Sequence, residues 1–154
     1  MGGFSLFVLV LGPVLAAIAV AIFLVSKLRG KVREANQAAL DRLGEHNIIE
    51  YIEGANFFGQ KSRGMGQVRG NGCLGISRDA IVFEMWLPRR SFEILVRNIT
   101  AVHEERSFLG KAVGMAKVIV IDYKSETGTE DAMGFVLPDW REKLKAIQKL
   151  VETR

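Results

Sequence analysis

Several kinds of residue are scarce in this sequence of 154 residues. The only cysteine is Cys73, which excludes an intrachain disulfide and fits a reducing compartment. The two histidines, His46 and His103, lack a second histidine or cysteine at ligand spacing, so the sequence predicts no metal site. There is also no long Pro-, Ser- or Gln-rich tract and no internal repeat, which argues against a low-complexity or repeat protein.

Motifs of known catalytic chemistry are also missing. The sequence has no nucleophile elbow, no phosphate-binding loop with its lysine, and no motif of paired catalytic carboxylates. Gly70 to Gly75 spell G-x-G-x-x-G, but a dinucleotide site needs a helix directly afterwards, and strand-like residues follow here. We interpret Asn71-Gly72 as a tight turn or the beginning of a strand, where glycine accepts a positive φ. The sequence therefore predicts a protein that is not an enzyme and has no cofactor.

Ionisable groups are absent from residues 4–25. As a helix, these roughly 22 residues reach about 33 Å, enough to cross the hydrocarbon core of a bilayer. A juxtamembrane basic cluster follows directly: Lys27, Arg29, Lys31 and Arg33. By the positive-inside rule, we expect a single-pass plasma-membrane protein with the N-terminus outside and the remaining chain in the cytoplasm. A cleaved signal peptide is disfavoured, because no basic residue precedes the apolar run and Ser26-Lys27-Leu28 stands where cleavage would occur.

The net charge supports this interpretation. The chain has 21 Lys and Arg against 17 Asp and Glu, and from Glu34 onward each sign occurs 17 times. The whole excess of +4 therefore lies in the juxtamembrane basic cluster, where each residue adds about 1 kcal/mol of attraction to anionic headgroups. The basic isoelectric point consequently does not indicate a nucleic-acid partner.

We divide the chain into a transmembrane anchor (1–28), a juxtamembrane helical stalk (29–45) and one further domain (46–154). Lys31 to Leu43 have the composition of a helix that continues the anchor, and Gly44 suits the position after its end. The roughly 110 residues that follow suffice for one domain with its own core. The apolar loop at Phe108-Leu109 either folds back onto that domain, the interpretation we favour, or touches a membrane or partner.

Short runs of β-branched and aromatic residues, separated by turn residues, fill the domain. The expected strands are 50–58, 68–76, 80–87, 91–96, 99–105, 117–123 and 131–137. The spacing predicts an antiparallel barrel or sandwich. A closing helix is expected from Asp139 to Thr153, with Asp139 and Glu142 as a capping box and Trp140 as the buried anchor of its apolar stripe.

The sequence resembles the pleckstrin-homology (PH) superfold and GRAM-like domains. The run from Gly70 to Phe83 resembles their G-x-G-x-L-x-[IL]-[ST] pattern with its following strand, and Ile94 to Ile99 resembles a later strand transition. Cys73 and Gly75 depart from this pattern, because bulkier apolar residues are common there. The resemblance covers about residues 48–154. Several bacterial membrane-tethered proteins look like this chain, with an anchor, a stalk and a PH-like barrel of about seven strands that a C-terminal helix caps.

The resemblance also implies a candidate anion or lipid-headgroup site. In PH domains that bind phosphoinositides, basic residues of the first interstrand loop and of the corner between the third and fourth strands meet at one end of the barrel. The residues at those places here are Lys61, Arg63, Arg89 and Arg90, with Arg69 nearby. Cations that converge on one pocket bind phosphate through charge-assisted hydrogen bonds. The alternative is a basic corner that only aids solubility.

The function expected from these features is a tethered binding or adaptor module at the cytoplasmic face of the membrane. Its partner would be a protein or an anionic lipid headgroup, and the anchor favours a protein because the domain needs no lipid affinity to reach the membrane. Two alternatives remain: an accessory structural subunit of a membrane complex, and a lipid- or envelope-modifying enzyme whose site is not recognisable.

Overall fold

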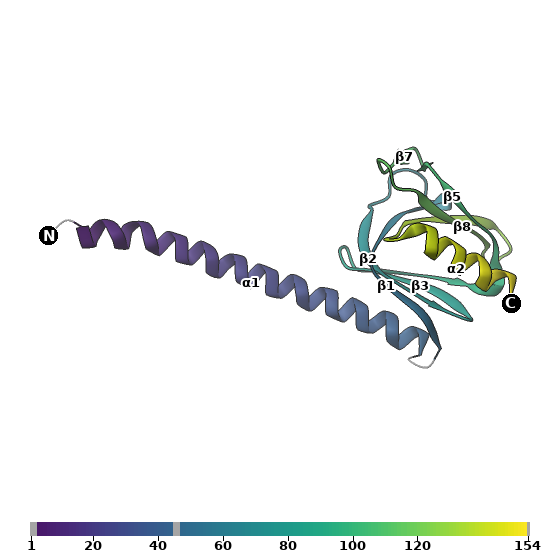
Figure 1. Ribbon diagram of the computed structural model, residues 1–154, viewed down its shortest axis with the longest axis horizontal. Helices are drawn as coiled ribbons and strands as arrows, with labels where there is room; N and C mark the ends of the chain where they lie inside the picture. The colour runs from purple at the N-terminus through teal and green to yellow at the C-terminus, as the bar shows by residue number, and fades with distance from the viewer. Residues whose placement is uncertain (1–2, 45–46, 154) are drawn as a thin grey trace. The chain divides into compact units, whose positions relative to one another are not determined.

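The structure is a computed structural model that describes residues 3–44 and 47–153, with only the backbone described for residues 3–11. His46 therefore lies outside the described residues. The chain forms two compact units, one of residues up to Glu34 and one from Ala35 onward. Helix α1, Gly3–Leu43, is unbroken through the predicted stalk and ends at Gly44, whose φ of 69° is the left-handed value typical after a helix (Figure 1).

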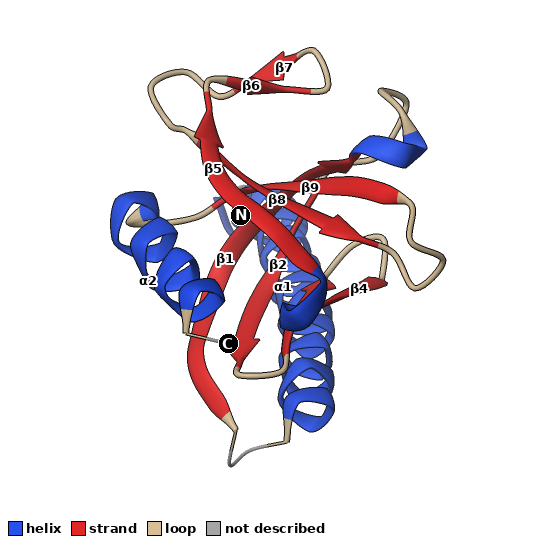
Figure 2. Cartoon of the chain, turned by 90° about the vertical axis from the view of Figure 1, so that its right-hand side faces the viewer, coloured by secondary structure: helices blue, strands red, loops and turns tan. Residues whose placement is uncertain are grey.

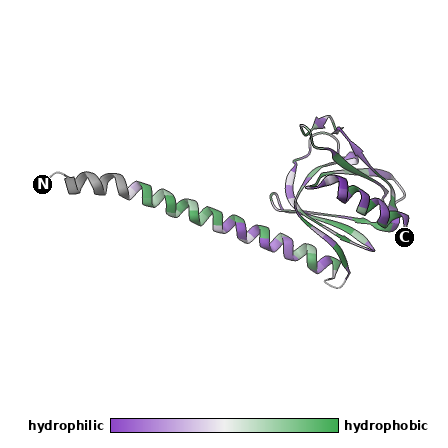
Figure 3. Cartoon of the chain, viewed as in Figure 1, coloured by the Kyte–Doolittle hydropathy of each residue, from purple (hydrophilic) through white to green (hydrophobic). Residues whose placement is uncertain are grey.

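Within the described residues, α1 is the one helix long and apolar enough to cross a membrane. Figure 3 shows a mostly hydrophobic stretch of α1 followed by turns in which hydrophilic residues predominate. The side chains from Gly12 to Leu28 are exposed to the surroundings, so protein packing does not account for their apolar character.

Seven antiparallel strands form the main sheet of the second unit, in the order β4-β3-β2-β1-β9-β8-β5 (Figure 2). Their bounds are β1 Ile48–Gln60, β2 Gly70–Ser77, β3 Ala80–Met85, β4 Arg90–Leu95, β5 Ile99–Glu105, β8 Val118–Lys124 and β9 Glu130–Val136. All seven expected strands are confirmed. The longest is β1, which pairs with β2 over most of its length and with β9 from Asn56 onward.

One face of this sheet encloses the main core. Four aromatic rings meet there, with centroids 4.3 to 6.3 Å apart: Phe57, Phe83, Phe92 and Phe135. On β4 the side chains alternate between the core and the surface: Phe92 and Ile94 are buried while Glu93 is exposed. Such rings and β-branched side chains provide most of the apolar area that folding removes from water.

Gly72 differs from its sequence interpretation. It lies within β2 at an ordinary strand φ, so a positive φ is not the reason for glycine there. A Cβ at this position would collide with the Glu84 backbone and the Phe83 ring, so the close approach of β3 requires the missing side chain.

The last turns of α1 pack on the outer face of β2 and β3. Ala35, Ala39 and Leu43 are buried there, and Leu43 occupies the space that a side chain at Gly75 would need. The small residues that depart from the PH pattern, Cys73 and Gly75, are thus explained by this helix segment. The second compact unit begins at Ala35, before the expected domain start at residue 46, because these turns belong to its packing.

Polar contacts surround this docked segment. The Asn36 side chain donates to Glu53 Oε1 at 2.6 Å and accepts from the Trp86 indole at 3.2 Å. Arg42 pairs with the buried Glu84 carboxylate at 3.3 Å. These contacts join α1 to β1, to β3 and to Trp86 directly after β3, and they fix which face of the helix segment meets the sheet.

A short hairpin of β6, Ser107–Phe108, and β7, Lys111–Ala112, covers a second apolar cluster. Phe108 is buried against Phe58, Val118 and Val120. Its ring uses the space beside Gly134, where a Cβ would lie 2.6 Å from it. The loop therefore folds back onto the domain, as we favoured from the sequence.

Helix α2, Trp140–Glu152, packs against the main core through the fully buried Ile147. Two details differ from the sequence expectation. Trp140 is only half-buried, since it is the first residue of the helix and its ring lies under the Arg141 guanidinium. Asp139 precedes the helix but has a left-handed φ of 49° and makes no side-chain cap, so the predicted capping box is wrong; its carbonyl accepts from Glu142 N instead.

Candidate functional site

The predicted basic residues lie on two loops. Lys61 and Arg63 belong to a single helical turn, η1 Lys61–Arg63, directly after β1, while Arg89 and Arg90 lie where β4 begins. All four are exposed. One contact shows that the two loops lie close together. The guanidinium carbon of Arg63 is 5.9 Å from the centroid of the ring of Phe92, which lies two residues after Arg90 on β4. Arg63 and the arginines of β4 therefore lie at one end of the sheet.

Lys61 is placed differently. It lines a hollow of about 250 Å³ together with the carboxylates of Asp122, Glu130 and Asp131. Arg63, Arg89 and Arg90 are not among the residues that line this hollow. Arg63 thus lies over a ring near the beginning of β4, whereas Lys61 lines an acidic hollow.

The buried carboxylate of Asp131 holds η1 in place. It accepts from Ser62 N at 2.8 Å, from Ser62 Oγ at 2.7 Å and from the Gln60 side chain at 2.6 Å, and the Tyr123 hydroxyl donates to it at 3.0 Å. Burial alone would raise the pKa of Asp131, but the hydrogen bonds from Ser62 and Gln60 outweigh burial and lower it. Burial and the adjacent Asp131 raise the pKa of Tyr123, which therefore stays a protonated donor.

Gln67 fixes the rest of the loop between β1 and β2. Its amide nitrogen donates to the carbonyls of Gln60 at 2.6 Å and Gly64 at 2.5 Å, and its oxygen accepts from Gln60 N at 3.0 Å. The Lys111 ammonium, from the β6–β7 hairpin, donates to the Gln67 carbonyl at 3.4 Å. No sequence pattern indicated Gln67 or Asp131, and Asp131 meets its partner Ser62 only in the folded chain.

Large apolar side chains are exposed on the same two loops. Met65 is 67% exposed and Val68 52% exposed, and both lie between Arg63 and Arg69 in the sequence. Leu87, 58% exposed, lies two residues before Arg89. We call these three apolar residues, together with Arg63, Arg89 and Arg90, the loop end. A surface that combines cations with exposed apolar side chains matches the chemistry of an anionic bilayer surface.

The juxtamembrane basic cluster lies on α1. Lys27, Arg29, Lys31 and Arg33 are all exposed, and the Lys27 ammonium lies 5.3 Å from the centroid of the Phe23 ring. Such long side chains keep their charge in a polar environment while their stems cover apolar surface.

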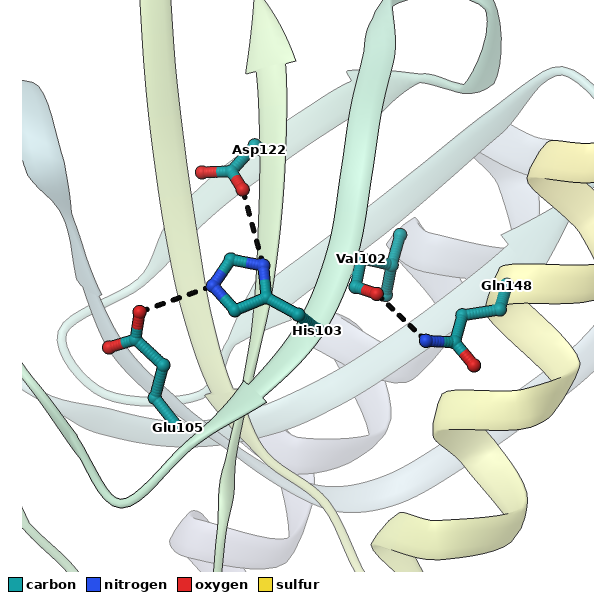
Figure 4. Close-up of polar contacts among 5 residues, drawn as sticks. All are labelled: Val102, His103, Glu105, Asp122 and Gln148. Carbon is teal, nitrogen blue, oxygen red and sulfur yellow. Dashed lines mark hydrogen bonds and ion pairs between the residues drawn. The ribbon is translucent and has the colours of Figure 1, made fainter.

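Residues with potential catalytic or metal chemistry are engaged in structural contacts. His103 lies between Asp122 and Glu105, 3.3 Å and 3.1 Å from their carboxylate oxygens, which joins β5 to β8 (Figure 4). No group of three or more His, Cys, Asp or Glu that could hold a metal occurs among residues 3–44 and 47–153. Cys73 is fully buried, and burial raises the pKa of its thiol, which keeps it in the less nucleophilic protonated form.

Comparison with known proteins addresses the fold. No protein-family model matches the sequence, and a comparison with curated proteins gives no match. The C-terminal domain of an unknown protein from Leishmania infantum is similar at 16% identity and a TM-score of 0.50, over 75% of this chain and 93% of that one.

Two further solved structures are similar at TM-scores below 0.5. The Vps36 N-terminal PH domain has a TM-score of 0.47 at 12% identity, over 69% of this chain and 79% of that one. A chain of the 8S snRNP assembly intermediate has a TM-score of 0.49 at 10% identity, over 70% and 81%. The strand order and the C-terminal helix of the present structure confirm the expected fold: a PH-like, mainly β domain that follows a long apolar helix.

Proposed function

We propose that this protein is a non-catalytic binding module, tethered by α1 to the plasma membrane, whose loop end engages an anionic lipid surface on the cytoplasmic side. The observation that carries the proposal is the alternation of cations and exposed apolar side chains on two adjoining loops. Each cation that meets a phosphate contributes about 1.5–3 kcal/mol. Met65, Val68 and Leu87 each add apolar area that leaves water on contact with the bilayer.

The rigidity of the loops supports the same proposal. Asp131 and Gln67 hold the segment from Gln60 to Gln67 in one conformation, so little conformational entropy is lost when the loop binds. The tether supports it further, because attachment to the membrane gives the domain a high effective concentration near headgroups. A weak affinity then suffices to orient the domain.

Co-sedimentation with liposomes tests the proposal. The fragment that begins at Glu34 lacks the juxtamembrane basic cluster and has equal numbers of acidic and basic residues, so net charge alone does not attract it. We expect it to sediment with anionic but not zwitterionic liposomes, and Arg89→Glu with Arg90→Glu to weaken this binding at least about tenfold. The matched control is Arg78→Glu with Arg97→Glu, two exposed arginines at the opposite ends of β3 and β4. Equal binding to both lipids, or equal losses in the two double variants, would refute the proposal.

A further inference from the structure

The two outer strands of the main sheet differ in their surroundings. β5 packs against α2, and the side-chain amide of Gln148 donates to the carbonyl of Val102 at 2.9 Å (Figure 4). β4, at the opposite end of the strand order, pairs only with β3 among the described strands. The second edge of β4 therefore keeps backbone donors and acceptors to which an extended segment can add as a new strand.

A hollow of about 360 Å³ borders this part of β4. Glu93, Ile94 and Leu95 line one side, while the end of β8 and the turn after it, residues 123–126, line another. Its volume lies within the range of about 300–1,000 Å³ that is usual for sites that bind small ligands or side chains. The hollow thus offers space for side chains of a strand paired with β4.

The lining has a definite chemistry. Leu95 is partly buried and lies two residues from Glu93, on the same face of β4, where it gives an apolar contact surface. Glu93 and Glu126 are exposed, come from different lining segments, and have no ion pair with any residue that the structure describes. Lys124 also lines the hollow, which leaves an excess of one negative charge. A cation between the two carboxylates would form charge-assisted hydrogen bonds with them.

We propose that β4 and this hollow form a second binding site, which takes an extended peptide segment of a protein partner with a lysine or arginine beside apolar residues on one face. The peptide backbone pairs with the edge of β4. Because alternate side chains of a strand point to the same face, a cation between Glu93 and Glu126 places apolar side chains two positions away beside Leu95, which lies two residues from Glu93 on β4. The site selects the opposite charge to the loop end, so the two surfaces accept different partners at the same time.

The test uses the full chain in nanodiscs of zwitterionic lipid and the fluorescent probe peptide Thr-Val-Thr-Lys-Thr-Val, which carries lysine and both valines on one face. We expect saturable binding by fluorescence anisotropy and at least about tenfold weaker binding of the peptide in which glutamate replaces lysine. N-methylation of the amides on one edge of the peptide should abolish binding, whereas methylation on the other edge should not, since only one edge pairs with β4.

Variants of the protein locate the site. Glu93→Lys with Glu126→Lys should remove the preference for the lysine peptide, while Asp41→Lys with Glu152→Lys, two exposed acids outside the hollow, should retain it. Absence of binding, equal affinity for the lysine and glutamate peptides, or equal effects of the two methylation patterns would overturn the proposal. These outcomes are independent of lipid charge, so they leave the function proposed for the loop end untouched.

Discussion

At the scale of single residues, Asp131 determines where two of the predicted cations lie. Its carboxylate binds both the backbone and the hydroxyl of Ser62, the residue between Lys61 and Arg63. Lys61, on one side of Ser62 in the sequence, lines an acidic hollow, and the guanidinium of Arg63, on the other side, lies over the Phe92 ring. No sequence pattern indicated the different surroundings of Lys61 and Arg63, because Asp131 is far from the loop along the chain.

Replacement of this carboxylate gives a pH-dependent prediction. The folded-state pKa of Asp131 is lowered, so its ionised form stabilises the fold above the ordinary carboxyl pKa of about 4, and this stabilisation is lost as pH falls through the lower folded value. At neutral pH, Asp131→Asn should reduce the free energy of unfolding by about 1.5–3 kcal/mol. The difference from the native chain should narrow below about pH 4 in urea denaturation of the fragment from Glu34. The exposed Asp79→Asn is the control, and a difference that stays constant with pH would contradict the assigned role.

At the scale of elements, the end of α1 is part of the folded domain rather than a free stalk. Ala35, Ala39 and Leu43 bury little apolar area compared with the main core, and polar contacts from Asn36 and Arg42 complete the interface. The fit depends on small residues in β2. Segments with such limited apolar burial open at a lower free energy than the whole domain.

Cys73 reports directly on this interface. Its sulfur is fully buried, 3.9 Å from the carbonyl of Ala35. Gly75→Val should push Leu43 away and destabilise the docked segment by roughly 1–3 kcal/mol, which corresponds to about 5- to 150-fold faster reaction of Cys73 with a thiol reagent. Gly66→Val is the control, since Gly66 has no neighbour within 4 Å of a built Cβ. Unchanged labelling of the Gly75 variant would show that the segment does not cover Cys73 as described.

The elements also show what sequence patterns can predict. Strand positions followed from runs of β-branched and aromatic residues, and all seven were found. Sequence patterns predicted the ends of helices and strands less well. Asp139 and Glu142 match a capping box in sequence, yet the chain turns from β9 into α2 through a left-handed Asp139, whose side chain makes no capping hydrogen bond. Trp140 likewise matches the apolar stripe of α2, but the buried anchor is Ile147, nearer the middle of the helix.

At the scale of the whole molecule, the proposed function combines a membrane tether with a binding surface. We propose that the apolar part of α1 crosses the membrane once and, because four cations follow it, that the next domain lies in the cytoplasm. The domain contributes cations and apolar side chains on adjoining loops. A tether makes such a surface suited to orientation of the domain on the bilayer more than to recruitment, because the domain is already close to the membrane.

The most direct test measures contact between the loop end and the bilayer in the full chain. Nanodiscs of anionic and of zwitterionic lipid would receive chains with Cys73→Ala and one new cysteine, at Met65 or at the exposed Arg78 beyond the other end of β2. An environment-sensitive dye on each cysteine reports whether that position enters the lipid. The account predicts a blue-shifted emission and quenching by a lipid-embedded quencher at position 65 in anionic discs only, with neither at position 78. Identical dye emission at the two positions, or in the two lipids, would contradict it.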